Sequence, residues 1–174
     1  MKKWLLALVT ALVLAACGDT DTANDTAKTN EEIIEEGTVG FEMLGGSIEE
    51  ASGVPTEEKE KILAAFNEYI ESFNAEDIDR YAQTTSKQAK GFDYELDLQE
   101  AQKVFDLYTI NRQVENVTIV KYNETEVQVF ANLNVEMTEE ETNTEVSSQG
   151  RQVTVLVKED DAWKVSSVYY IGEN

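Results

Sequence analysis

The spacing of apolar residues changes once along this chain, and that change limits the possible folds more than any other feature. Between positions 62 and 73, apolar residues recur every three or four positions, which predicts a helix with one apolar face. Between 127 and 137 they alternate with polar residues, which predicts a long, half-buried strand. Helices followed by a run of antiparallel strands define an α+β domain.

Three helices are expected before the strands. The first begins at Thr56, whose hydroxyl can cap it. A second, short helix begins where Asn74 is followed by Asp77, and Asp97 with Glu100 form the cap of a third. The first helix buries Ile62, Phe66, Tyr69, Ile70 and Phe73, and the third turns Ala101, Phe105 and Tyr108 inward.

About four strands are expected after the helices. A first strand around Val117 and Ile119 turns at 123–124 into the long strand, and a polar loop over 138–148 leads to a third strand at 153–157. The last strand runs over 163–171, and the sheet is expected to curl around the first helix. The inward residues of the long strand are all apolar: Val127, Val129, Ala131, Leu133, Val135 and Met137.

The N-terminal residues have the organisation of an export signal. Two lysines precede the apolar run 4–16, which is shorter than the ~20 residues that a membrane-spanning helix needs. The run ends in Leu-Ala-Ala-Cys, with Ala16 before the expected cut and Cys17, the only cysteine, after it. This ending resembles the bacterial lipobox, which implies a signal peptide over 1–16 and a mature lipoprotein that starts at a lipidated Cys17. An ordinary secreted protein or a true membrane anchor are the alternatives.

The segment 17–55 is predicted to be an acidic, flexible tether. It contains too few apolar residues to offset the entropy cost of ordering. Val39, Phe41 and Met43 alternate within it, so they either dock on the domain or form a short motif for a partner. Two acyl chains on Cys17 would hold the chain on the membrane, with the domain 56–174 on the extracellular face.

Composition excludes several kinds of chemistry. The chain has 14 basic and 35 acidic residues, for a formal net charge of −21, so it would repel nucleic acid. It contains no histidine, which removes the commonest general base and metal ligand. We expect no metal and no cofactor.

The order of the elements and two sequence segments carry a resemblance to a known family. Phe73-Asn-Ala-Glu-Asp-Ile-Asp-Arg-Tyr81 follows the first helix, and Leu156-Val-Lys-Glu-Asp-Asp-Ala-Trp-Lys-Val165 forms the last hairpin. Over residues 56–174 the chain resembles the nuclear transport factor 2-like (SnoaL-like) superfamily, in particular lipoproteins of Gram-positive bacteria. The resemblance implies a cone-shaped, curved sheet of the cystatin-like type wrapped on the helices. It implies no particular activity.

Binding is favoured over catalysis by the inner face of the sheet. Catalytic relatives place an aspartate or histidine base on this face, where the present chain has only apolar residues. The predicted cavity is lined by Phe66, Tyr69, Tyr108, Ala131, Leu133, Val135 and Tyr169. It would hold a small apolar ligand. The alternative is an isomerase or dehydratase of the SnoaL-like class that uses tyrosine or carboxylate groups.

The remaining candidate residues lie outside that cavity. Phe130 and Tyr170 are expected on the outer face of the sheet, where they would support a homodimer or contact a surface protein. Arg80 and Arg112 are expected in surface ion pairs, and Arg151 at the rim of the cavity.

Replacing Cys17 with serine should leave an uncleaved precursor or release the protein from the membrane, because no thiol remains to carry the lipid. Membrane fractionation and intact mass measure this outcome. Unchanged fractionation and mass would contradict the anchor.

Overall fold

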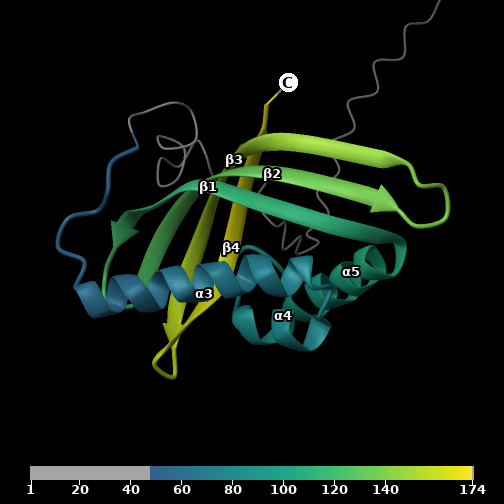
Figure 1. Cartoon of the computed structure of the whole chain (residues 1–174). Helices are drawn as coiled ribbons and strands as arrows, with labels where there is room; N and C mark the ends of the chain where they lie inside the picture. Colours follow the sequence, from purple (N-terminus) through teal and green to yellow (C-terminus); the bar gives the residue numbers. More distant parts are fainter. Residues whose placement is uncertain (1–47, 174) are drawn as a thin grey trace, which may run out of the picture.

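The computed structural model of this protein describes residues 48–173 (Figure 1). The predicted signal peptide, Cys17 and the motif of Val39, Phe41 and Met43 lie outside this part of the chain. The described residues form three helices followed by a four-stranded antiparallel sheet in the order β1-β2-β3-β4, which confirms the α+β prediction. The elements are α3 (Thr56–Asn74), α4 (Ile78–Thr84), α5 (Tyr94–Leu107), β1 (Tyr108–Tyr122), β2 (Glu126–Glu139), β3 (Glu145–Glu159) and β4 (Ala162–Gly172).

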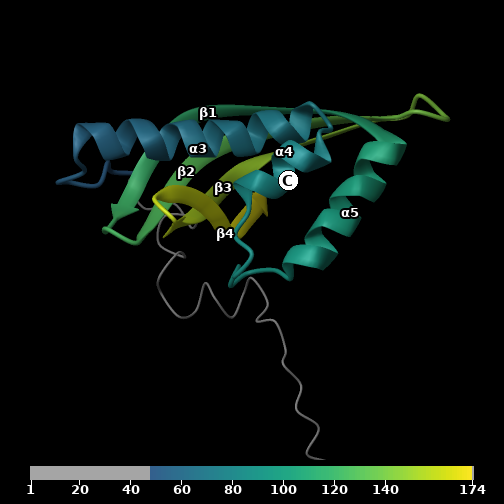
Figure 2. The same ribbon diagram turned by 90° about the horizontal axis from the view of Figure 1, so that it is seen from below.

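The helices cover one face of a strongly bent sheet. In Figure 1, α3 runs beneath the strands, and α4 and α5 lie beneath the other end of the sheet. The view from below shows α5 crossing that end, and α4 contacts both α3 and α5 (Figure 2). The part of the chain described here has no helix long and apolar enough to cross a membrane.

The predicted apolar face of the first helix is confirmed. Ile62, Phe66, Tyr69 and Ile70 are buried on α3, and Phe73 packs against the same core. The predicted cap is wrong, because Pro55 occupies the N-cap position and no side chain caps the helix. Thr56 is already the first helical residue, so its hydroxyl does not occupy the capping position.

The other two helices begin at aspartates that act as caps. The predicted short second helix is present as α4, but its cap is Asp77, which accepts a hydrogen bond from the Arg80 amide at 3.0 Å, because Asn74 is the last residue of α3. Asp93 accepts one from Leu96 at 2.9 Å, so α5 begins earlier than the predicted cap at Asp97. Tyr108 was expected inside this helix but is the first residue of β1 in extended conformation.

The long central strand is confirmed as β2, but the polar loop after it is much shorter than predicted. Pairing between β2 and β3 continues out to Thr138 and Glu145. The residues of β3 up to Gln149 are exposed, so they extend the hairpin beyond the core. Their polar side chains carry no burial pattern, and the sequence therefore resembled a loop.

A bulge in β4 changes the face on which the last aromatic residues lie. Val155 pairs with Ser167 whereas Leu156 pairs with Val165, so Ser166 is an extra residue. Strict alternation from Trp163 predicted Tyr169 on the inner face. After the bulge, Val168 packs in the inner core and Tyr169 packs on the outer face.

Two apolar clusters therefore lie on opposite faces of the sheet. The inner cluster joins the helices to the inward residues of the strands, and Val127, Val129 and Ala131 are fully buried in it. The outer cluster is centred on Phe130 and Val153 and includes Val120, Tyr169 and Ile171.

The described residues before α3 pack against both clusters. Ile48 contacts the outer cluster, Val54 contacts the inner one, and the Ala51 amide donates to the Ile119 carbonyl at 2.7 Å. The packed unit therefore extends into the last part of the segment that was assigned to the tether.

Replacing Phe66 with alanine should lower the free energy of unfolding by ~3–5 kcal/mol, because this fully buried ring fills the space between α3 and the sheet. Urea denaturation followed by circular dichroism measures the loss. The control is Asn67→Ala at the neighbouring exposed position, with an expected effect within about 0.5 kcal/mol. A much smaller loss for Phe66→Ala would show that the interior is already hollow.

Candidate functional site

A small polar cluster lies inside the inner core, where three helices meet β1. It consists of Tyr69 on α3, Tyr81 on α4, Asp97 on α5 and Arg112 on β1. The Tyr81 hydroxyl donates a hydrogen bond to Asp97 Oδ2 at 3.0 Å. Around these groups, aromatic rings pack edge to face, with Phe73 5.3 Å from Tyr81 and 4.8 Å from Phe105 between ring centroids. This polar cluster is the candidate site.

The backbone of Arg112 is fixed by the end of α3. The Asn74 side chain donates to the Arg112 carbonyl at 2.9 Å and accepts from the Arg112 amide at 2.7 Å. These two bonds satisfy backbone groups on the free edge of β1. Because Arg112 alternates with Ile110 and Val114, its side chain enters the face that carries the inner core.

The guanidinium of Arg112 is held by aromatic rings instead of a carboxylate. Its central carbon lies 4.4 Å from the centroid of Phe73 and 5.5 Å from that of Tyr69. Contacts of this kind stabilise a desolvated cation by roughly 0.5–2 kcal/mol. The Nη1 atom of Arg112 is buried and has no hydrogen-bond partner. A buried donor without a partner is uncommon and marks a place where a ligand group or an ordered water fits.

Burial shifts the pKa values of Asp97 and Tyr81. Desolvation raises the pKa of Asp97, and the hydrogen bond from Tyr81 and the charge of Arg112 only partly oppose it. Burial is the main reason that the pKa of Tyr81 lies far above its usual range, and the nearby Tyr69 and Asp97 raise it further. Tyr81 is therefore a neutral hydrogen-bond donor. Burial destabilises the ionised form of the Asp97 carboxyl relative to its protonated form.

This arrangement offers three chemical functions. Arg112 can hold an anionic or carbonyl oxygen, the rings can pack against an apolar body, and Asp97 can exchange a proton. Within residues 48–173, no three acidic, histidine or cysteine side chains are grouped so as to hold a metal ion.

The structure divides the predicted cavity residues between different surroundings. Phe66, Tyr69 and Ala131 are buried in the inner cluster, and Tyr108 packs against it. Leu133 is buried and Val135 is half-buried on β2, as expected for inward positions. Tyr169 belongs to the outer cluster, because the bulge in β4 reverses its direction.

The two residues predicted on the outer face are also separated. Phe130 lies there but is only 3% exposed, because neighbouring apolar side chains cover it. The Tyr170 ring lies against Gly150, and its hydroxyl is 2.7 Å from that of Ser148. Because of the bulge in β4, Tyr170 lies on the same face of the strand as the inward Val168.

The predictions for the arginines differ in outcome. Arg80 forms a half-exposed ion pair with Glu68, with the Arg80 Nε 2.9 Å from Glu68 Oε1, as expected. Arg112 does not form the predicted surface ion pair, because the alternation of side chains along β1 directs it to the inner face, with Ile110 and Val114. Arg151 has its Nε buried without a partner.

The sequence analysis placed Asp97 only in a helix cap and Arg112 in a surface ion pair, so it missed both as site residues. The sequence nevertheless carries a signal for each. Asp97 precedes Ala101 and Phe105 at intervals of four residues, so all three share the buried face of α5. Arg112 stands at an alternate position between Ile110 and Val114. A charged residue in register with buried neighbours indicates an internal site.

Solved structures with the same fold define the class of this domain. A nuclear transport factor 2-like superfamily protein from Salmonella enterica matches with a TM-score of 0.60 and 13% identity, over 69% of this chain and 94% of that one. A candidate dehydratase of the same family from Streptomyces avermitilis has a TM-score of 0.60 and 12% identity, over 69% and 99%. A candidate scytalone dehydratase from Novosphingobium aromaticivorans has a TM-score of 0.60 and 14% identity, over 68% and 85%. The present domain has the nuclear transport factor 2-like fold.

The sequence places the chain more narrowly. It belongs to the family of the C-terminal domain of the anti-sigma-I factor RsgI9, whose family profile matches residues 64–171. No curated protein sequence matches the chain.

Replacing Asp97 with asparagine should raise the free energy of unfolding at pH 7. The folded pKa of Asp97 is raised above its usual value of 3.8, so the carboxyl reduces stability as the pH rises through 3.8 to the folded pKa. Asparagine still accepts from Tyr81 but carries no charge. The gain should therefore vanish below pH 3.8, as measured by urea denaturation across pH.

The matched control is Asp106→Asn on the exposed side of the same helix, which removes one negative charge from the chain without affecting the core. Equal gains in the two variants would mean that overall charge, and not burial of Asp97, sets the effect.

Proposed function

We propose that this protein is a lipoprotein, anchored through Cys17, whose extracellular domain binds a small ligand at the Arg112 cluster without transforming it. The lipobox-like ending at Cys17 supports the anchor. The ligand that fits the cluster has an aromatic or apolar body and one anionic oxygen group.

One observation carries the binding proposal: the buried Arg112 Nη1 has no partner. Removing a donor from water without replacing its hydrogen bond costs roughly 1–3 kcal/mol, and more when the group is charged. A carboxylate on a ligand would accept from this nitrogen. The neighbouring rings of Phe73 and Tyr69 already desolvate the guanidinium, which strengthens such a bond.

The inner face of the sheet supports binding over catalysis. The inward positions of β2, from Val127 to Met137, carry no titratable side chain. Asp97 is the carboxyl of the cluster, and one of its oxygens already accepts from Tyr81. As a general base, Asp97 would therefore have to take a substrate proton through its other oxygen, Oδ1.

A second function, a dehydratase or isomerase, is favoured by the environment of Asp97. Its pKa is raised by burial, and a raised carboxyl pKa suits proton transfer near neutral pH. In this alternative Asp97 is the base, Tyr81 orients it and Arg112 stabilises an oxyanion. Two of the structural neighbours are described as candidate dehydratases, but they share only the fold at 12% and 14% identity.

A panel of aromatic carboxylates tests the binding proposal. Benzoate, 4-hydroxybenzoate and cinnamate are titrated into the full chain, and the melting temperature is followed. We expect a saturable rise for at least one compound, and at least a tenfold weaker apparent affinity in Arg112→Met, which keeps the apolar stem but removes the charge. Arg80→Met is the matched control, because Arg80 forms only a half-exposed ion pair.

The same samples separate binding from catalysis. Nuclear magnetic resonance spectra of the bound compounds should stay unchanged over hours. Turnover that disappears in Asp97→Asn would establish the enzyme alternative, and the absence of any stabilising carboxylate would contradict a site at Arg112.

A further inference from the structure

The outer cluster lies on the face of the sheet that the helices leave uncovered (Figure 1). The strand register aligns Phe130 with Val153 and Val153 with Tyr169, so an apolar row crosses β2, β3 and β4. Among the described residues, Ile48 is the only member of the cluster that does not belong to a strand. Tyr169 and Ile171 on β4 are half-buried. An apolar row on a sheet face is a surface that a further apolar segment can cover.

The described chain enters this face from the edge of the sheet at β1. The Ala51 amide donates to the Ile119 carbonyl at 2.7 Å, and three residues earlier Ile48 packs on the outer cluster. Toward the N-terminus, the chain therefore passes from the edge onto the middle of the sheet. Four strands spaced about 4.8 Å apart are roughly 14 Å wide, and five extended residues span about 17 Å. The residues just before Ile48 are thus long enough to reach β4.

The sequence before Ile48 contains an apolar segment, residues 39–44, which lies outside the described part of the chain. Val39, Phe41 and Met43 alternate within it, so an extended chain places all three on one side. Its one acidic residue is Glu42, whereas residues 18–38 contain seven acidic residues. The segment is therefore the part of the predicted tether that is suited to an apolar surface.

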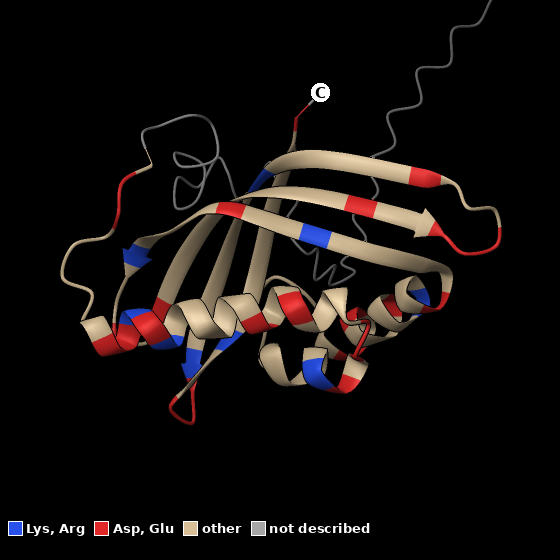
Figure 3. Ribbon diagram, viewed as in Figure 1, with Lys and Arg blue, Asp and Glu red and all other residues tan. Residues whose placement is uncertain are grey.

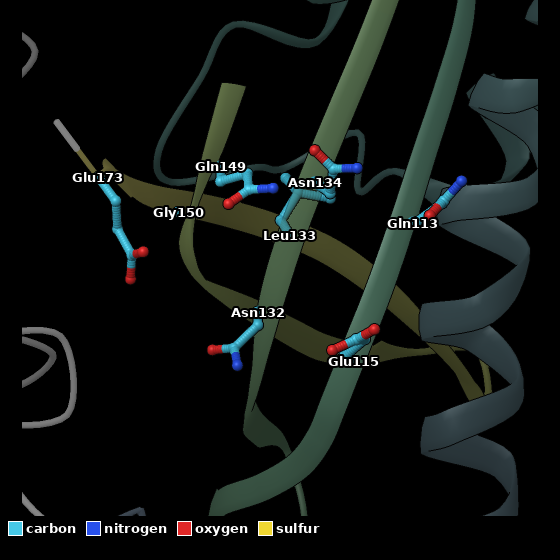
Figure 4. A pocket seen from close by; sticks show the side chains of 8 residues that line it. All are labelled: Gln113, Glu115, Asn132, Leu133, Asn134, Gln149, Gly150 and Glu173. Carbon is cyan, nitrogen blue, oxygen red and sulfur yellow. The ribbon is translucent and has the colours of Figure 1, made fainter. Parts of the chain in front are cut away.

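The polarity of the described surface also favours the outer cluster. Figure 3 shows acidic residues along the helices and in the turns, whereas the middle of the strands is largely uncharged. Further along the same face, Gln113, Asn134 and Gln149 line a polar hollow (Figure 4). Covering these carboxamides with apolar side chains would remove them from water without replacing their hydrogen bonds. The apolar segment therefore fits the outer cluster and not the polar end of this face.

We propose that residues 39–44 dock on the outer cluster, with Phe41 and Met43 against Tyr169 and Ile171. Only residues 45–47 separate the segment from Ile48, and a short linker of this kind gives an effective concentration in the millimolar range. A second copy of the chain would have to compete with that concentration and with the repulsion between two chains of net charge −21 each. Docking shortens the predicted tether to residues 17–38, and it does not depend on the function proposed for Arg112.

Truncation of the segment tests the docking. In the full chain in detergent, the double variant Phe41→Ala and Met43→Ala should lower the melting temperature by at least about 3 °C, because apolar contacts of the folded state are lost. The matched control is Ile33→Ala with Ile34→Ala, which removes two apolar side chains from the acidic part of the tether and should shift the melting temperature by less than about 1 °C. An unchanged melting temperature in the first variant would overturn the proposal and favour a motif for a partner.

A double-mutant cycle locates the contact. Tyr169→Ala is made in the wild type and in the double variant, and it should cost less in the double variant, because the side chains that it contacts are already gone. Leu96→Ala on α5 alters an exposed residue of another element and should have the same effect in both backgrounds. Additive losses for Tyr169→Ala would place the segment elsewhere on the domain and contradict the proposed site.

Dilution separates docking within one chain from association between copies. The melting temperature of the wild type should not change on tenfold dilution, because docking within a chain does not depend on concentration. A melting temperature that falls on dilution in the wild type, and no longer does so in the double variant, would show that the segment joins two copies. That result would overturn docking within one chain.

Discussion

Burial of the apolar face of α3 against the inner face of the sheet is the contact on which the rest of the structure depends. Phe66 and Ile62 from the helix and Val127, Val129 and Ala131 from the strand β2 are all fully buried. A single sheet face and a single helix face are each unstable in water, so each provides the surface that the other needs. The remaining elements pack around this contact.

The bend of the sheet and its irregular points place polar groups on both faces. Asn116, with a φ of 54°, lies where the β1–β2 register shifts, and Ser166 is the extra residue in β4. Gly150 cannot carry a side chain, because a Cβ would lie 2.3 Å from the Ile171 carbonyl oxygen. Bulges of this kind increase the twist of the strands.

Polar groups on the two faces of the sheet are left unpaired for different physical reasons. In the Arg112 cluster, a cation lies against aromatic rings, and the Asp97 carboxyl already accepts from Tyr81. On the outer face, the neutral side chains of Gln113, Asn134 and Gln149 stand on neighbouring strands, where the strand register keeps them side by side. The first arrangement suits a ligand with an anionic group.

The sequence by itself determined the elements that depend on local period: α3, α4, the long strand β2 and the α+β class. It also determined that the inner row of β2 is apolar, because alternation holds along an uninterrupted strand. Only the tertiary structure decided the direction of side chains beyond a break in the local period. The bulge at Ser166 moved Tyr169 to the outer face, and the early cap at Asp93 placed Asp97 inside α5. Pairing across strands also decided which polar residues meet, because residues such as Asn134 and Gln149 become neighbours only through the register of a folded sheet.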